Sequence, residues 1–125
     1  MSLRSPLGKV LGRGSAGEGV GHWWVQRVTA VALVPLTAWF AWSLLALELH
    51  SYDAVRGWLG RPWVAVLTVL LVVTLAWHSK LGVQVVIEDY VHGKAAKTSL
   101  LLLSLFVHAG AAVSGVFALL LLALS

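Results

Sequence analysis

Three long apolar runs constrain this chain more than any other feature. They cover residues 25–47, 63–87 and 99–124, and short polar connections over residues 48–62 and 88–98 separate them. A helix needs roughly 20 apolar residues to cross a bilayer. The sequence therefore predicts an all-α fold of three transmembrane helices. The short connections predict that consecutive helices lie antiparallel.

The composition agrees with a membrane protein. Of the 125 residues, 59% are hydrophobic and 11% are charged, whereas about a quarter of the residues of soluble domains are charged. So short a chain cannot bury this much apolar surface in its own core, so lipid must cover it. The absence of cysteine excludes disulfides, thiolate metal sites and iron–sulfur ligation by this chain. The net charge of +4 comes from residues that flank the apolar runs, so no nucleic-acid partner is expected.

The basic residues also predict the orientation. Residues 1–21 contain no apolar segment of a signal peptide and are predicted to form a flexible cytoplasmic tail, followed by a membrane anchor domain over residues 22–125. One side of the membrane has only Arg56 and Arg61, so the positive-inside rule places the N-terminus in the cytoplasm. The tail lacks the amphipathic pattern of a transit peptide, which favours the bacterial inner membrane over the mitochondrial one. The basic residues expected on the cytoplasmic side are Arg4, Lys9, Arg13, Arg27, Lys94 and Lys97.

The second apolar run carries a histidine, His78, at membrane depth. An ionisable residue inside a membrane is costly and usually functional. At about 100° per residue, His78, Gly82 and Asp89 share one helix face. Gly82 removes side-chain bulk one turn from His78, which allows a flat group or another backbone to approach the imidazole. A neutral imidazole is a common axial ligand of haem iron. The alternative is that His78 only hydrogen-bonds a neighbouring helix, that Asp89 is a solvated helix end and that Tyr90 is an interfacial aromatic.

Three other polar residues have two interpretations each. Arg27, near the start of the first run, either extends its guanidinium to the lipid headgroups or holds a carboxylate such as a haem propionate. Lys80 lies about 200° around the helix from His78 and is expected to reach the headgroups or a partner chain. His108, in the third run, is expected to be a packing or hydrogen-bonded residue, although one chain with two histidines could in principle ligate a haem alone. The chain contains no motif of a complete catalytic site.

The combination of His78, Gly82, Asp89 and Tyr90 in the second of three spans resembles the small hydrophobic (D-type) anchor subunit of succinate dehydrogenase, respiratory complex II. The segment Trp24-Val25-Gln26-Arg27-Val28-Thr29-Ala30 is similar to the start of the first helix in that family. The resemblance covers residues 22–125.

The resemblance implies a role for each of these residues. His78 would be one axial ligand of a haem b, with the second ligand on a partner C-type anchor subunit, and Arg27 would approach a haem propionate. Tyr90 would hydrogen-bond a ubiquinone carbonyl near the cytoplasmic surface, and Asp89 would support it and help to supply protons. The flavoprotein and iron–sulfur subunits would oxidise succinate, and this chain would dock them to the membrane.

Two other functions remain open at this point. One is a fumarate reductase anchor that works in the opposite direction. The other is a small membrane protein without redox function, such as a transporter subunit or an assembly factor, in which His78 only bonds a neighbouring helix.

Overall fold

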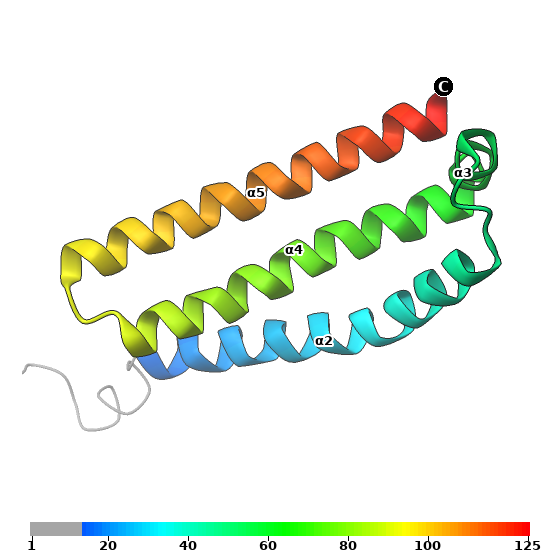
Figure 1. Cartoon of the computed structure of the whole chain (residues 1–125). Helices are drawn as coiled ribbons and strands as arrows, with labels where there is room; N and C mark the ends of the chain where they lie inside the picture. Colours follow the sequence, from blue (N-terminus) through cyan, green and yellow to red (C-terminus); the bar gives the residue numbers. More distant parts are fainter. Residues whose placement is uncertain (1–13) are drawn as a thin grey trace, which may run out of the picture.

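The structure, a computed structural model, describes residues 14–125, and the side chains from residue 19 onward. This part of the chain is entirely helical apart from its short connections (Figure 1). With the labels of Figure 1, the helices are α2 (Gly14–Ala46), α3 (Tyr52–Leu59), α4 (Pro62–Tyr90) and α5 (Lys94–Leu124). Three of the described helices, α2, α4 and α5, are long and apolar enough to cross a membrane. The prediction of an all-α fold with three transmembrane helices is confirmed.

The ends of the long helices follow local rules. Pro62 is the first residue of α4, a position where its missing N–H leaves no bond unmade. The helix ends after Tyr90 because Val91 has an extended backbone, with φ −97° and ψ 117°. Pro35 lies inside α2, and the helix continues past it to Ala46. The start of α2 at Gly14 lies within the range assigned to the tail, so the boundary between tail and anchor domain stays a prediction.

The connection between the first two spans contains a short helix that the sequence did not predict. This helix, α3, is capped by the Ser51 side chain, which accepts a hydrogen bond from the Ala54 N–H at 3.2 Å. Asp53 in its first turn suits the positive end of the helix dipole. Leu59 is buried, and Trp58 stacks on Trp39 of α2 with ring centroids 5.9 Å apart. The connection is therefore folded against the end of the helices and is not an open loop.

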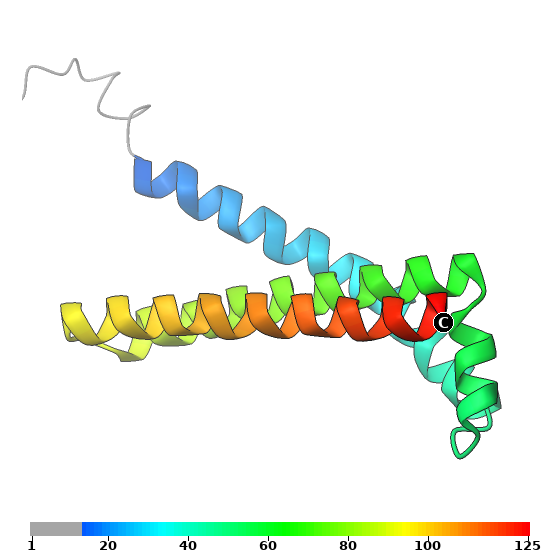
Figure 2. The same cartoon turned by 90° about the horizontal axis from the view of Figure 1, so that it is seen from above.

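Helix α4 is central to the packing. It contacts both α2 and α5, whereas α2 and α5 do not contact each other in the described part of the chain. Figure 1 shows the three long helices with α4 between the other two, and Figure 2 shows that the N-terminal part of α2 diverges from α4 and α5. The helices α4 and α5 approach closely at Gly115, where an added Cβ would lie 3.1 Å from Val72 Cγ1.

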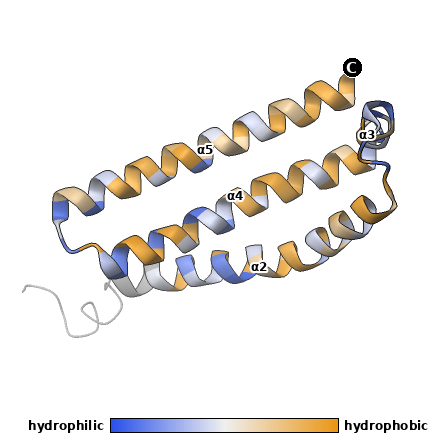
Figure 3. Cartoon of the chain, in the orientation of Figure 1, coloured by the Kyte–Doolittle hydropathy of each residue, from blue (hydrophilic) through white to orange (hydrophobic). Residues whose placement is uncertain are grey.

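Little of the hydrophobic surface is buried within the chain. The buried apolar residues are Leu59, Val64, Leu71, Leu81 and Ile87. Hydrophobic residues dominate all three long helices, with hydrophilic positions in the first half of α2 and the second half of α4 (Figure 3). Such faces require lipid or other subunits to cover them.

The described basic residues of the two connections lie at opposite ends of the helix bundle. The start of α2 and the turn between α4 and α5 lie at one end of the molecule, and α3 and the C-terminus lie at the other (Figure 1). Lys94 and Lys97 therefore share an end with the start of α2, and Arg56 and Arg61 lie at the opposite end. Three of the six basic residues assigned to the cytoplasmic side, Arg4, Lys9 and Arg13, lie outside the described residues.

Candidate functional site

The site begins where α2 and α4 meet, at His78. This half-buried histidine of α4 lies against Thr29 of α2, with 3.0 Å between His78 Nδ1 and Thr29 Oγ1. The same hydroxyl oxygen lies 2.8 Å from the Val25 carbonyl oxygen and 3.0 Å from that of Gln26, both in its own helix. No described residue forms a hydrogen bond with His78 Nε2. One nitrogen of the imidazole is therefore engaged, and the other remains available to a ligand.

Gly82, one turn from His78 on the same face of α4, adjoins open space. A Cβ at Gly82 would meet no atom within 4 Å. Asp89 lies further along this face and is exposed. At about 1.5 Å per residue, Asp89 is roughly 17 Å from His78 along the helix axis. This chain alone thus leaves room at Gly82, and the predicted approach of a flat group to the imidazole stays a prediction.

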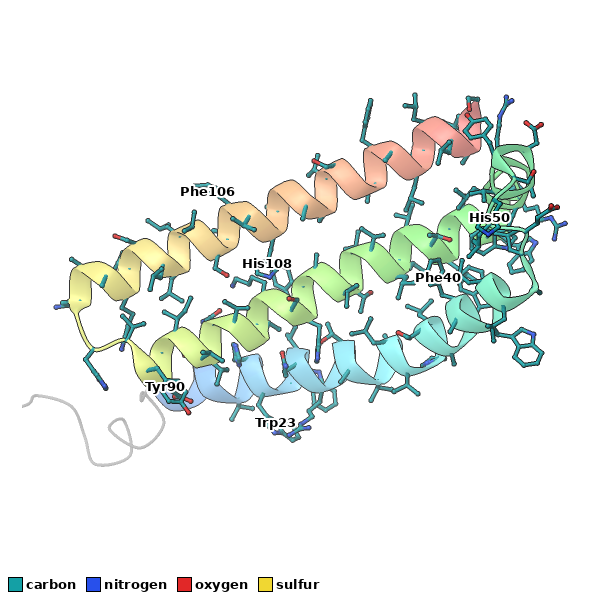
Figure 4. The ribbon with its side chains drawn as sticks, viewed as in Figure 1. Trp23, Phe40, His50, Tyr90, Phe106 and His108 are labelled. Atoms are coloured by element: carbon teal, nitrogen blue, oxygen red, sulfur yellow. The ribbon has the colours of Figure 1, made fainter. Side chains whose placement is uncertain are left out.

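Tyr90 is the last residue of α4 and projects from its end (Figure 4). Its side chain is 77% exposed, and no hydrogen bond to its hydroxyl occurs within residues 14–125. Asp89 and Tyr90 are therefore adjacent at one end of the helix bundle, with both polar groups facing outward. Their proposed contacts would have to come from a ligand or another subunit.

Arg27 lies on a different face of α2 from the one that meets His78. It is exposed, and its Cζ atom lies 5.6 Å from the centre of the Trp23 ring, a cation–π distance. Because Arg27 precedes Thr29 by two positions, it is about 200° around the helix from Thr29. A propionate held by Arg27 would therefore lie outside the α2–α4 contact, and this role stays a prediction.

His108 of α5 has a very different environment. Its Nε2 lies 3.1 Å from Ser79 Oγ of α4, and its Nδ1 lies 2.7 Å from the Ser104 carbonyl oxygen and 3.3 Å from Ser104 Oγ. Figure 4 shows His108 between the two helices. Both ring nitrogens are occupied, and the contact residue Ser79 is about 100° around α4 from His78. The arrangement is that of the hydrogen-bonded packing residue expected from the sequence.

Lys80 is held by a chain of side chains along α4. Its Nζ donates a hydrogen bond to Gln84 Oε1 at 3.0 Å, and Gln84 Nε2 donates to Glu88 Oε1 at 2.9 Å. Lys80 also lies over the Trp77 ring, 5.6 Å from its centre. These residues recur every four positions, so they form one polar stripe that connects a cation at membrane depth to a carboxylate near the helix end. The stripe gives Lys80 a hydrogen-bond partner within its own helix.

The contacts of Thr29 with His78 and of Ser79 with His108 were not predicted from the sequence. A signal for Thr29 was present, because His22, Gln26 and Thr29 recur at the spacing of one helix face. Two other side-chain atoms on this face, His22 Nε2 and Gln26 Oε1, are buried without a hydrogen-bond partner among the described residues. A polar face inside an apolar helix predicts a polar partner.

No metal centre is complete within the described part of the chain. No group of three or more His, Cys, Asp or Glu side chains is close enough to hold a metal ion there. A single imidazole with one available nitrogen suits a haem, because haem iron needs only one or two axial ligands from protein. The available imidazole nitrogen of His78 is thus a donor that fits a haem.

Comparison with known proteins identifies the family. Residues 1–118 match the family described as the succinate dehydrogenase/fumarate reductase transmembrane subunit. A succinate dehydrogenase hydrophobic membrane anchor subunit of Rickettsia bellii is 35% identical over 100 residues, which cover 80% of each chain. The subunit of the same name from Paracoccus denitrificans is 34% identical over 106 residues, which cover 85% of this chain and 82% of the relative.

No solved structure matches the chain. The relatives and the three apolar helices indicate a multi-pass protein of the bacterial inner membrane. The family also implies that the chain works together with other subunits. The chain belongs to the succinate dehydrogenase/fumarate reductase transmembrane subunit family.

Proposed function

We propose that the chain is the D-type membrane anchor of a succinate:ubiquinone oxidoreductase. It docks the flavoprotein and iron–sulfur subunits at the membrane, pairs with a C-type anchor subunit, and contributes to a haem site and a quinone site. The observation that carries this proposal is His78, a histidine at membrane depth with one ring nitrogen held by Thr29 and the other available. The names of the curated relatives favour succinate dehydrogenase over fumarate reductase.

The residues around His78 fit a haem b. His78 would hold the haem iron through one ring nitrogen, and the open space at Gly82 leaves room for a flat group next to the ring. Any second protein ligand would come from the C-type anchor, since both nitrogens of His108 are already engaged. Arg27, exposed on α2, binds a propionate with its planar guanidinium. When bound, the haem supplies a one-electron redox centre inside the membrane.

Tyr90 and Asp89 form this chain's part of the ubiquinone site. Reduction of a quinone to a quinol takes two electrons and two protons, and negative charge develops on the quinone oxygens as electrons arrive. The Tyr90 hydroxyl donates a hydrogen bond to one of these oxygens and stabilises that charge. Asp89, exposed at the water interface, passes protons from water toward this oxygen. The electrons come from succinate through the docked subunits.

The distribution of basic residues gives the orientation of the chain in the membrane. The N-terminus lies in the cytoplasm, because the sequence has six Lys and Arg before or near the start of the first span and in the connection after Tyr90, against two in the connection between the first two spans. The flavoprotein and iron–sulfur subunits dock on this cytoplasmic face, close to Tyr90 and Asp89.

The test is to purify the intact complex in a mild detergent, identify the chains that accompany this one, and record a reduced-minus-oxidised spectrum. We expect a flavoprotein, an iron–sulfur protein and a second anchor subunit, together with a b-type haem spectrum. A complex that contains these chains but no haem would remove the haem role and leave the docking role. Recovery of the chain without any of these partners would contradict the proposal as a whole.

A further inference from the structure

The distances around Thr29 show which residue donates the hydrogen bond between Thr29 and His78. A threonine hydroxyl has one proton and two lone pairs. Thr29 Oγ1 lies 2.8 Å and 3.0 Å from the carbonyl oxygens of Val25 and Gln26, which can only accept hydrogen bonds. If the hydroxyl donated its proton to His78 instead, its lone pairs would face two carbonyl oxygens at these short distances. The hydroxyl therefore donates to its own helix, and His78 Nδ1–H donates to Thr29 Oγ1.

We propose that Thr29 is a positioning residue that selects the tautomer of His78 in which Nδ1 carries the proton and Nε2 carries the lone pair. This inference rests on the proposed role of His78 as a haem ligand. A neutral imidazole protonated at Nδ1 can ligate iron only through Nε2. Hydrogen bonds of this kind to the second ring nitrogen fix the orientation of metal-binding histidines and raise their basicity.

The orientation of the His78 ring also depends on how α2 packs against α4. His78 lies on α4, and the group that orients it lies on α2. The acceptor is held in turn by the α2 backbone through the bonds of Thr29 to Val25 and Gln26. A shift of α2 against α4 would therefore change the direction in which Nε2 points. Thr29 acts on the haem site without touching the haem.

The test compares substitutions of Thr29 in the fully assembled complex. Thr29→Val removes the hydroxyl and keeps the shape, and Thr29→Ser keeps the hydroxyl. Thr37→Val is the matched control, because Thr37 is exposed on the same helix. The measurements are the haem midpoint potential, the low-spin electron paramagnetic resonance signal, and the rate of haem transfer to an excess of apomyoglobin.

We expect Thr29→Val to raise the midpoint potential, because an imidazole without its acceptor donates less electron density to iron. Haem transfer should become about 10- to 100-fold faster, in line with the usual cost of removing such a partner of a metal ligand. Thr29→Ser should restore both properties, and Thr37→Val should change neither. If Thr29→Val assembles poorly, Thr29→Ala provides a second variant without the hydroxyl.

Two results would overturn the inference while the haem role stands: an unchanged potential and transfer rate in a haem-containing Thr29→Val complex, or a Thr29→Ser complex that behaves like Thr29→Val. The second result would mean that the methyl group matters and the hydroxyl does not. A wild-type complex without haem, or an unchanged spectrum after removal of the His78 imidazole, would instead refute the proposed function, and the inference would fall with it.

Discussion

His108 at the α4–α5 interface and His78 at the α2–α4 interface differ in how their ring nitrogens are used, and the glycines near them, Gly115 and Gly82, differ in the space around them. At the α4–α5 interface both nitrogens of His108 are hydrogen-bonded, and Gly115 lies close against Val72. At the α2–α4 interface only His78 Nδ1 is engaged, and the space at Gly82 is open. Figure 2 shows α2 diverging from α4 on this side.

The number of hydrogen-bonded ring nitrogens distinguishes a histidine that only packs two membrane helices together from one that can also bind a ligand. A polar group that is satisfied within the chain stabilises the helix pair and needs nothing more. A polar group with one satisfied and one available nitrogen requires a further partner, because lipid offers none. Helix α4 thus has one face whose neighbouring histidine, His108, is fully hydrogen-bonded within the chain, and another face whose histidine, His78, has one nitrogen available for the proposed haem.

The largest expected effect comes from removing the imidazole on the open face. We expect His78→Ala to abolish or strongly alter the b-type spectrum of the complex, because one axial ligand is lost. His108→Ala is the matched control and should keep the spectrum. The measurement is a reduced-minus-oxidised spectrum of purified complex with a redox titration. An unchanged spectrum and midpoint potential in His78→Ala would remove the distinction between the two histidines.

The next largest effect is expected at the end of α4, where each face finishes in a polar group. Asp89 lies three turns beyond His78 on the same face, and Tyr90 lies three turns beyond Ser79 on the other. Tyr90→Phe should lower quinone reduction by roughly ten- to a thousand-fold, by analogy with the loss of one oxyanion donor. Asp89→Asn should be milder if water replaces its proton transfer.

The assay compares quinone with an artificial dye that accepts electrons before the quinone. Succinate oxidation with the dye should survive Tyr90→Phe, since the dye takes its electrons before they reach the proposed quinone site. Equal loss with both acceptors would identify Tyr90 as a docking contact, and unchanged quinone turnover would identify it as an interfacial aromatic.

A smaller effect, on stability, is expected when the two glycines Gly115 and Gly82 are each replaced by alanine. Gly115→Ala should destabilise the complex by about 1–3 kcal/mol, because its Cβ forces Val72 to move in a packed interface. Gly82→Ala meets no atom of this chain and should leave the packing of its three long helices unchanged, so any loss of stability that it causes would come from the proposed haem or from a partner subunit. Thermal unfolding of the purified complex measures both. If Gly82→Ala proved the more destabilising substitution, a partner helix or the haem would have to lie against Gly82.

The smallest effect is expected for His108. His108→Leu removes the hydrogen bonds between α4 and α5, but the hydroxyls of Ser79 and Ser104 can then bond to carbonyls of their own helices. The loss of stability should be about 1 kcal/mol, the usual size for polar contacts between membrane helices. Unfolding in a denaturing detergent measures it. A far larger loss together with a changed haem spectrum would show that the closed interface also serves the cofactor.

Much of the fold could be predicted from the sequence, because lipid imposes length and hydropathy on every spanning helix. The described helices contain the three predicted spans apart from Leu47, which directly follows α2, and they extend beyond most of the predicted ends. The helix α3 was missed because it is short and lies in the connection between two spans. Its Ser51 cap and the acidic residue Asp53 were visible, but a single turn signal does not distinguish a helix from a loop.

The site could be predicted only in part. His78 and Gly82 follow from spacing along one helix, which the sequence contains directly. Thr29 does not, because its contact depends on the relative position of α2 and α4, and a single sequence does not determine this register. The pairing of His108 with Ser79 was missed for the same reason. Contacts between helices thus required the structure, whereas the residues on one helix face did not.

The bonds of Thr29 to its own helix bear on how the chain is made. During synthesis α2 enters the membrane before α4 exists, so its polar groups meet lipid first. The hydroxyl of Thr29 can bond the carbonyls of Val25 and Gln26 at that stage, without any partner helix. Insertion of α2 therefore does not leave the Thr29 hydroxyl proton unpaired in hydrocarbon. When α4 follows, the His78 Nδ1–H meets an acceptor, Thr29 Oγ1, that is already in place. In this order of insertion the Thr29 hydroxyl is hydrogen-bonded both before and after α4 enters the membrane.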